Sequence, residues 1–327
     1  MAARSRVACG RRRDKPVVSA RDLEVDVVIA TNRASPYLDE AIASVVAQTH
    51  RRWNLILVDD GSPCPDVLQQ AVRNVAKAVV VRQPPQGVSA ARNRGLREGK
   101  AGFVAFLDDD DVWAPERLEA QLDAVVATPG SVGAFSGVWF MDADGARFGA
   151  VTASRTASRR FLTGEEDFPR IVSLLVTREV CEALGGFDES YRIGEDNEFI
   201  LRLLMQGELA AARDPLVGYR RHPDNASADV SLEARVEGLR MLGEQIAEAR
   251  RRHDVAVVTM LGANRERFRR RAAADAAAAL GQALRGSDWA RVAAELRWIA
   301  RHAPGGTLRE VARKATGRGL RGDRRGH

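Results

Sequence analysis

The chain has few cysteines, few aromatic residues and no long apolar run. Its 327 residues include three cysteines, Cys9, Cys64 and Cys181, and 6% aromatic residues. An odd number of widely spaced cysteines is not typical of a disulfide framework and favours a reducing compartment. No run approaches the roughly 18 apolar residues of a membrane-spanning helix, and no apolar segment of a secretory signal follows the N-terminal arginines. The expected location is therefore the cytoplasm.

Basic charge is scarce in the middle of the sequence and abundant at its ends. Residues 1–21 carry a net charge of +6 and residues 231–327 carry +10, whereas residues 22–230 carry −10. The pI of about 9.7 is that of a polyanion-binding protein, but it reflects the two ends alone. No nucleic-acid partner is expected, because aromatic residues do not alternate with the arginines and no nucleic-acid motif is present.

The first half of the sequence alternates apolar runs of strand length with amphipathic helical patterns. The expected strands are residues 25–30, 54–58, 78–81 and 103–107, and the helices between them are 35–46, 66–77 and 89–98. Because parallel strands need crossover connections, this alternation predicts an α/β fold with a mostly parallel, Rossmann-like sheet. Ligands of such sheets bind beyond the carboxyl ends of the strands. In the first of these helices, Ser35 is the expected N-cap and Val46 belongs to the apolar stripe.

The pattern changes after residue 129. Strand-like residues 132–141 and the apolar run 171–176 predict an antiparallel addition on the acceptor side of the sheet, followed by a helix over 195–205. From residue 231 the composition predicts helices, with one brief strand-like run, VAVV, at 255–258. The expected organisation is a disordered basic tail (1–22), a catalytic domain (23–230), an α-helical C-terminal region (231–316) and a disordered basic tail (317–327).

Four consecutive aspartates, Asp108 to Asp111, follow the fourth expected strand. Carboxylates this close raise one another's pKa and destabilise the fold unless a cation neutralises them. Oxygen ligands suit Mg²⁺ or Mn²⁺, and a site with one or two protein carboxylates leaves positions for phosphate oxygens. Taken alone, the four aspartates also fit two explanations without a metal: a solvated acidic loop, or the cap of a following helix that begins near Pro115.

Four segments of the sequence occur in the order and spacing of a known enzyme family. They are VVIATNRASPYLDEAIASVVAQTHRRWNLILVDDGS, GVSAARNRGLREGKAGFVAFLDDDDVW, LGGFDESYRIGEDNEFILRLLMQG and YRRHPDNAS. Together they resemble the family 2 glycosyltransferases of the GT-A fold, over about residues 24–227. The resemblance implies an inverting transfer of one sugar from a nucleoside diphosphate sugar to an acceptor hydroxyl on a glycan or lipid-linked molecule, in polysaccharide, glycolipid or glycoconjugate biosynthesis.

The resemblance also implies roles for individual residues. Asp196 is the general base, and one base suffices for inversion because the acceptor hydroxyl attacks opposite the leaving group. Asp110 and His222 are ligands of a Mn²⁺ or Mg²⁺ ion that bridges the two phosphates. The residues that bind the nucleotide sugar are Thr31, Arg33, Asp60, Arg92, Asp108 and Asp109.

Several alternatives stay open on the sequence. UDP is the first choice of nucleotide, with dTDP and GDP remaining. A sugar-1-phosphate nucleotidyltransferase shares the acidic site, but the segment after Ala30 lacks the glycine-rich loop of that class. A non-catalytic binding protein is the third alternative.

Two parts of the chain also have a structural alternative. Arg92 fits a nucleotide-binding residue and an ion-pair partner of Asp59 or Asp60 equally well. The basic C-terminal helices either contact an anionic membrane at its inner face or pack on the catalytic domain with a solvated basic face.

Overall fold

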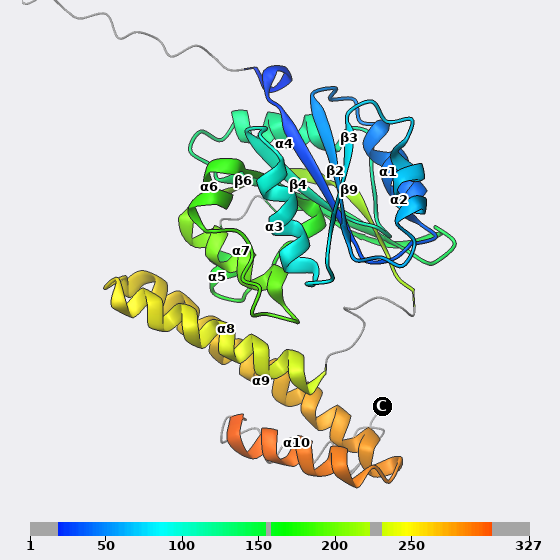
Figure 1. The fold of residues 1–327 in the computed structure, drawn as a ribbon. Helices are drawn as coiled ribbons and strands as arrows, with labels where there is room; N and C mark the ends of the chain where they lie inside the picture. Colours follow the sequence, from blue (N-terminus) through cyan, green and yellow to red (C-terminus); the bar gives the residue numbers. More distant parts are fainter. Residues whose placement is uncertain (1–18, 155–157, 223–230, 303–327) are drawn as a thin grey trace, which may run out of the picture.

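The computed structural model describes residues 19–154, 158–222 and 231–302 (Figure 1). Within these ranges nine strands form one sheet in the order β3-β2-β1-β4-β8-β6-β9-β5, with β7 paired to β6. The strands are β1 (Val25–Thr31), β2 (Trp53–Asp60), β3 (Ala78–Gln83), β4 (Phe103–Asp108), β5 (Val112–Trp113), β6 (Gly133–Met141), β7 (Arg147–Val151), β8 (Leu174–Thr177) and β9 (Leu209–Arg220). The helices of the α/β part are α1 (Leu38–Val46), α2 (Pro65–Val72), α3 (Val88–Glu98), α4 (Arg117–Val126), α5 (Ser158–Leu162), α6 (Arg178–Ala183) and α7 (Glu195–Gln206).

The first four long strands are parallel, as the alternating pattern predicts. The chain moves outward from β1 through β2 to β3, and α3 then carries it back to β4 on the other side of β1. Since such crossovers are right-handed, this reversal puts α1 and α2 on one face of the sheet and α3 on the other. The carboxyl ends of β1 and β4 therefore form a topological switch point, where ligands of open α/β sheets bind.

Helix α3 packs closely against β1 because Gly95 has no side chain. A Cβ atom at Gly95 would lie 2.3 Å from Cγ1 of Val28. A buried ion pair fixes the opposite end of β1, where Arg178 lies 2.6 Å from Asp26. The amide of Ala101 also donates to Asp26, at 2.7 Å. These contacts hold β1, α3 and α6 as one unit under the carboxyl ends of the strands.

The expected antiparallel addition is present. Strand β8 pairs antiparallel with both β4 and β6. Strand β9 was not expected from the sequence, and it pairs parallel with β6 over a register that shifts near Pro215. Proline lacks the N–H that donates to a neighbouring strand, and within sheets it occurs at bulges and edges. Pro215 at the register shift therefore interrupts the regular pattern by which a strand is predicted from sequence. The expected N-terminal tail also ends earlier than predicted, because residues 20–22 form a 3-10 turn and Ala20 is buried; residues 1–18 lie outside the described ranges.

The C-terminal region is helical and packs on the α/β part. It consists of α8 (Leu232–Arg251), α9 (Val255–Arg285) and α10 (Trp289–His302), and Figure 1 shows α8 and α9 side by side below the sheet. Three side chains of α8 and one of α9 join the main hydrophobic core, namely Met241, Leu242, Ile246 and Leu261. The VAVV run begins α9 and is not a strand, because Asp254 caps it by accepting from the amide of Val257 at 2.9 Å. The tail expected at 317–327 lies outside the described residues.

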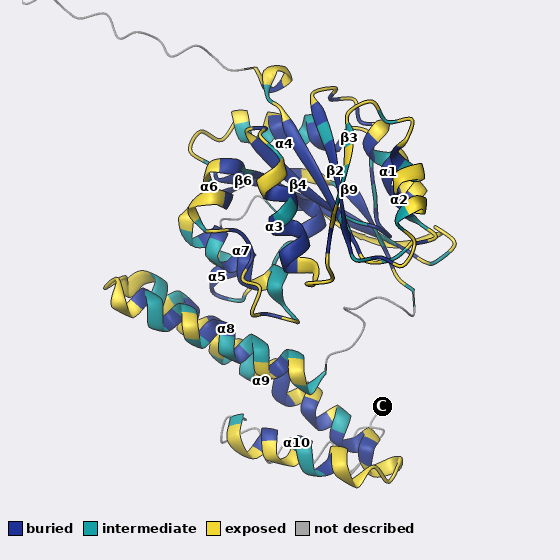
Figure 2. Cartoon of the chain, viewed as in Figure 1, coloured by how far each residue is buried: buried dark blue, intermediate teal, exposed yellow. Residues whose placement is uncertain are grey.

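A second, smaller core lies where α8, α9 and α10 meet. It is built from alanines of α9 between residues 272 and 283 together with Leu239, Val292, Trp298 and Ile299. The buried guanidinium of Arg235 in α8 lies 2.6 Å from the buried carboxylate of Glu295 in α10. Figure 2 shows that the outer surfaces of these helices are largely exposed. The basic C-terminal region thus has both a packed side and a solvent side.

Three local expectations about helices α1 and α2 were wrong. Ser35 does not cap α1; its hydroxyl accepts from the amide of Tyr37 at 3.3 Å in the preceding turn, and Tyr37 is the N-cap residue. Val46 is 42% exposed, because α1 ends there and its last turn leaves the sheet. Helix α2 ends at Val72, several residues before the expected Lys77. Residues 73–77 instead connect the end of α2 to β3, which begins at Ala78.

Candidate active site

A cavity of about 420 Å³ opens at the switch point between β1 and β4. Loops after β1, β2 and β4 form one wall, and the start of α7 with the Arg170 to Val172 segment forms the other. All predicted site residues except His222 line it, together with nine neighbours. The lining residues are Ala30, Thr31, Asn32, Arg33, Asp60, Val88, Ala91, Arg92, Asp108, Asp109, Asp110, Arg170, Ile171, Val172, Glu195, Asp196 and Tyr219.

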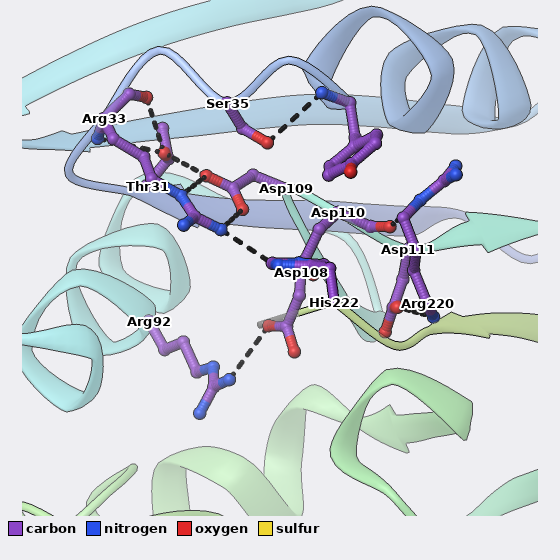
Figure 3. A network of polar contacts seen from close by, with 11 residues as sticks. Thr31, Arg33, Ser35, Arg92, Asp108, Asp109, Asp110, Asp111, Arg220 and His222 are labelled. Atoms are coloured by element: carbon purple, nitrogen blue, oxygen red, sulfur yellow. Dashed lines mark hydrogen bonds and ion pairs between the residues drawn. The ribbon is translucent and has the colours of Figure 1, made fainter. Parts of the chain in front are cut away.

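The four aspartates after β4 have different partners. Asp109 accepts from the hydroxyl of Thr31, and its carboxylate lies 3.3 Å from the Arg33 guanidinium. The same guanidinium lies 3.2 Å from Asp110, whose other neighbour is the His222 Nε2 atom at 3.0 Å. Figure 3 shows these side chains converging on the loop from β1 and from the end of β9. His222 therefore belongs to the site through Asp110, although it does not line the cavity.

Burial and charge crowding change the acidity of this loop. Burial, followed by the neighbouring Asp108 and Asp109 carboxylates, raises the pKa of Asp110, and the hydrogen bond from His222 opposes this rise. Burial also holds the pKa of Asp111 well above its usual range. Both groups bind a proton more tightly than a solvated carboxyl does, because negative charge is poorly compensated at this position. A bound cation would relieve that crowding.

Asp111 is a structural residue and does not reach the cavity. Its Oδ1 atom accepts from the backbone amide of Arg220 at 2.8 Å. Arg220 is 1% exposed and its guanidinium contacts the carbonyl oxygen of Asp110 at 2.9 Å and Glu40 at 2.6 Å. The ring of Tyr37 lies 4.2 Å below the same guanidinium. Arg220 therefore fixes the acidic loop to the end of β9 and to α1.

Arg92 is an ion-pair residue, but its partners are not those considered from the sequence. Its buried guanidinium donates to Asp108 at 3.0 Å and to Glu195 at 3.1 Å. Asp59 pairs instead with Arg82. The charges of Asp108 and Glu195 outweigh burial and raise the pKa of Arg92. Arg92 thus joins the acidic loop after β4 to the first turn of α7.

Asp60 holds the loop before α3 and retains capacity for one more donor. Its carboxylate accepts from the side chain of Gln83 and from the backbone amides of Gln86 and Gly87, each at 2.8 Å. A carboxylate has about four lone-pair positions, so these three donors leave capacity for one more, and Asp60 lines the cavity. Gly87, with φ of +94°, makes the turn that brings its amide to this carboxylate.

The first turn of α7 presents Glu195 and Asp196 to the cavity. Gly194, in the left-handed region with φ of +78°, precedes the helix, and the Asp196 carboxylate accepts from the adjacent amide of Asn197 at 2.7 Å. Burial and the Asp196 charge raise the pKa of Glu195, whereas Arg92 lowers it. Glu195 is thus held by Arg92 in an ion pair, whereas Asp196 forms no ion pair within 4 Å among the described residues and acts on Arg92 only through its charge.

The residues fit a divalent cation at the acidic loop. Within the described ranges, no three histidine, cysteine, aspartate or glutamate side chains form a ready cluster for a metal. Asp110 and His222 do form a close carboxylate and imidazole pair, and Asp108 has a side chain 35% exposed beside the cavity. Such a pair suits Mn²⁺ and leaves most coordination positions for phosphate oxygens.

Sequence comparison identifies the family. Residues 26–142 match the family model for glycosyl transferase family 2. An uncharacterized glycosyltransferase of Nostoc sp. is 31% identical over 241 residues, which is 68% of this chain and 74% of that protein. The chain belongs to glycosyltransferase family 2. As a member of this family it is a glycosyltransferase enzyme, and the alternatives of a nucleotidyltransferase or a non-catalytic binding protein are thereby set aside.

More distant relatives match this family 2 glycosyltransferase over shorter regions. The succinoglycan biosynthesis protein ExoW of Rhizobium meliloti is 41% identical over 29% of this chain and 32% of its own length. The UDP-Glc:alpha-D-GlcNAc-diphosphoundecaprenol beta-1,3-glucosyltransferase WfgD of Escherichia coli is 29% identical over 32% of this chain and 42% of its own length. The chain thus spans less than half of these two relatives.

A solved structure shares the fold. The crystal structure of S. aureus TarS 1-349 in complex with UDP-GlcNAc is 17% identical, with a TM-score of 0.53 over 69% of this chain and 66% of that one. The fold of this family 2 enzyme is therefore the GT-A fold with an added helical C-terminal part, as predicted. In the part of the chain that the structure describes, no helix is long and apolar enough to cross a membrane.

Sequence reasoning missed five residues of the site. Glu195, Arg170 and Tyr219 line the cavity, Arg220 holds the acidic loop, and Arg117 donates to the carbonyl oxygens of Val172 and Leu174 at 3.0 and 2.8 Å. For Arg220 and Arg117, the signal in the sequence was an arginine next to an apolar segment. Trp113 is buried in the core, with its ring 3.7 Å from the Arg117 guanidinium.

Proposed function

We propose that the enzyme is an inverting glycosyltransferase that moves a sugar from a UDP-sugar to an acceptor hydroxyl during polysaccharide or glycolipid assembly. The observation that carries this proposal is one cavity lined by the acidic loop on one wall and by Asp196 on the other. An inverting transfer needs a bound leaving group and a base on the opposite side of the reacting carbon. No covalent nucleophile is required.

The nucleotide lies against the first wall in this proposal. The remaining lone pair of Asp60 accepts the imide N–H of a uracil ring, while Thr31 and Arg33 flank the base and ribose. Thr31 and Arg33 are held in place by Asp109. Names of relatives support a uridine donor, since WfgD is named for UDP-Glc and the TarS crystal contains UDP-GlcNAc.

Asp110 and His222 hold a Mn²⁺ or Mg²⁺ ion in the proposed complex, with Asp108 beside it. When bound, such an ion supplies Lewis-acid stabilisation of the departing diphosphate. The chain itself contributes the Arg33 guanidinium, 3.2 Å from Asp110, and the Arg92 guanidinium, 3.0 Å from Asp108. These two arginines keep the acidic loop ordered and offset its charge before the donor arrives.

Asp196 takes the proton of the acceptor hydroxyl. It stands in the first turn of α7, the end of a helix that attracts negative charge. The neighbouring Glu195 is occupied by Arg92, so Asp196 is the carboxylate of this turn that is available to the acceptor. Its position on the wall opposite Asp60 and Thr31 fits attack from the face opposite the diphosphate.

A peripheral contact with an anionic membrane is proposed for α10. A row of residues spaced three and four apart on this helix includes Trp289 and Leu296, which are 69% and 50% exposed. The same helix carries the exposed arginines Arg291, Arg297 and Arg301, none of which forms an ion pair within 4 Å with another described residue. An apolar row with aromatic and arginine neighbours is typical of helices that lie in a membrane interface. Flotation with anionic liposomes at low salt tests this contact. The full chain should rise with the liposomes, and a chain that remains at the bottom of the gradient overturns the proposal.

A thermal-shift screen tests the proposed donor. UDP, dTDP and GDP are added to the full chain with and without Mn²⁺, because a ligand that binds the folded state raises stability by mass action, about 2.7 kcal/mol at 100 times its Kd. The expected result is a UDP shift that grows with Mn²⁺. Equal shifts for all three nucleotides contradict the uridine assignment, and no shift for any of them contradicts the proposed donor site.

A further inference from the structure

Two arginines flank an aromatic cluster beside the second wall of the cavity. The guanidinium of Arg170 lies 3.9 Å from the Tyr219 ring and 5.7 Å from the Phe140 ring. The guanidinium of Arg221 lies 4.7 Å from Phe140 and 5.6 Å from Phe148. The rings of Phe140 and Phe148 are stacked, with centroids 6.0 Å apart. Both cations thus rest on one continuous aromatic surface.

These two arginines differ from Arg33 and Arg92 in forming no ion pair within 4 Å among the described residues, although the charge of Arg170 also acts on the buried Asp111. Arg33 and Arg92 each contact two carboxylates. For Arg170 and Arg221, the described residues provide contacts to aromatic rings in place of ion pairs. A guanidinium on an aromatic face keeps the edge that carries its N–H donors available, because the ring covers its flat side. Two such edges form a site for the oxygens of an anion.

The position of the cluster assigns it to the acceptor. Arg170 and Tyr219 line the same cavity as Asp196, and the Phe140 ring carries the contact on to Arg221 beyond the cavity lining. Phe148 extends the aromatic surface outward and is 55% exposed. The donor's own phosphates have other partners in the proposed complex, at the acidic loop. An anion on Arg170 and Arg221 therefore belongs to the molecule that receives the sugar.

We propose that Arg170 and Arg221 bind an oxyanion of the acceptor, a phosphate or a uronate carboxylate close to the hydroxyl that is glycosylated. The Phe140 and Phe148 rings pack against the adjoining apolar or sugar part of the acceptor. Guanidinium groups match the spacing of phosphate and carboxylate oxygens and bind them through paired hydrogen bonds. This inference rests on the proposed function, since it assigns the acceptor side of the same cavity.

Binding to the UDP-loaded full chain tests the inference. Saturating UDP and Mn²⁺ occupy the donor side, and phenyl phosphate, phenyl glucuronide and phenyl glucoside are then titrated as probes that share one ring and differ in charge. The expected result is tighter binding of at least one anionic probe than of the glucoside, by about tenfold or more. Comparison of the two anionic probes distinguishes a phosphate from a uronate source.

Substitutions assign the binding to these residues. Arg170→Gln and Arg221→Gln should each weaken the anionic probe by about tenfold and leave phenyl glucoside binding unchanged. Arg73→Gln, a change of an exposed arginine at the end of α2, serves as the matched control. Equal binding of all three probes, or anionic binding that persists in the double variant, overturns the inference. UDP binding measured beforehand reports on the proposed function independently.

Discussion

The Arg92 guanidinium donates to Glu195 at 3.1 Å across a separation of 103 residues. The same side chain reaches Asp108, so one buried cation connects the loop after β4 with the first turn of α7. These two elements form opposite walls of the cavity. Arg92 therefore sets the width of the space between the acidic loop and the proposed base.

Removing this cation should destabilise the protein strongly. Arg92→Met leaves two carboxylates beside the cavity without their partner, and breaking a buried pair in this way costs about 3–5 kcal/mol. The double variant Arg92→Met/Glu195→Gln should recover part of the loss, because one of the stranded charges is gone. Urea unfolding of the three proteins measures both effects. A double variant as unstable as the single one would show that Glu195 is not the partner that matters.

Replacing Asp196 should abolish transfer and preserve donor binding. The amide of Asp196→Asn cannot take up the acceptor proton, and general-base catalysis contributes about 10²–10⁴-fold. UDP release in the presence of phenyl glycoside acceptors should fall by that factor, with the thermal shift by UDP unchanged. Asp123→Asn, at an exposed position of α4, should retain full activity. Normal turnover in the Asp196 variant would remove it from the role of base.

Replacing Asp110 should remove the effect of the cation on nucleotide binding. Asp110→Asn loses one proposed ligand, so the extra stabilisation by UDP that depends on Mn²⁺ should disappear while the smaller shift without Mn²⁺ remains. Asp144→Asn, in the exposed turn between β6 and β7, is the control. A Mn²⁺ effect that is undiminished in the Asp110 variant excludes this carboxylate as a ligand.

A methyl group at Gly95 should separate α3 from β1. The added Cβ would meet Val28 at 2.3 Å, and overpacking of this kind costs about 1–3 kcal/mol. Gly102→Ala is the matched control, because nothing lies within 4 Å of its Cβ position. Adding Val28→Ala to Gly95→Ala should restore part of the melting temperature. Gly95→Ala with the stability of the Gly102 variant would mean that α3 does not pack as described.

Stability should fall in mild acid through His50. Burial lowers the pKa of His50 from 6.5, and its Nε2 atom lies 3.0 Å from the carbonyl oxygen of Leu23. The folded state therefore disfavours the protonated ring, so this contribution to stability is complete above pH 6.5 and is lost as the pH falls below that value. His50→Gln should flatten the dependence of the melting temperature on pH between 7.5 and 5, which are about one unit above and 1.5 units below the ordinary value. The exposed His253→Gln should leave the dependence unchanged.

The sequence was sufficient to predict the sheet and the position of the site, because both depend on local patterns. Buried parallel strands are continuous apolar runs, and the carboxyl ends of β1, β2 and β4 must lie at one edge of the sheet. Thr31, Asp60 and Asp108 therefore had to lie together, and all three line the cavity.

Long-range partners could not be predicted in this way. For Arg92, an ion pair with Asp59 or Asp60 was the alternative to nucleotide binding, and both aspartates are closer to it in sequence than Glu195. The side chain turns instead toward α7, whose placement depends on packing of Phe199 and Phe187 against Phe106. Arg220 was missed because β9 contains Pro215 at a register shift and so lacks a regular strand pattern. Both errors concern contacts that only the assembled core determines.

Helix α9 belongs to both hydrophobic cores of the molecule. Leu261 near its start lies in the main core, and its alanines from 272 onward lie in the second core with α10. A continuous helix of 31 residues spans about 46 Å at 1.5 Å per residue. Because a helix and not a linker joins α10 to the α/β part, whatever surface α10 contacts also fixes the direction in which the mouth of the cavity points.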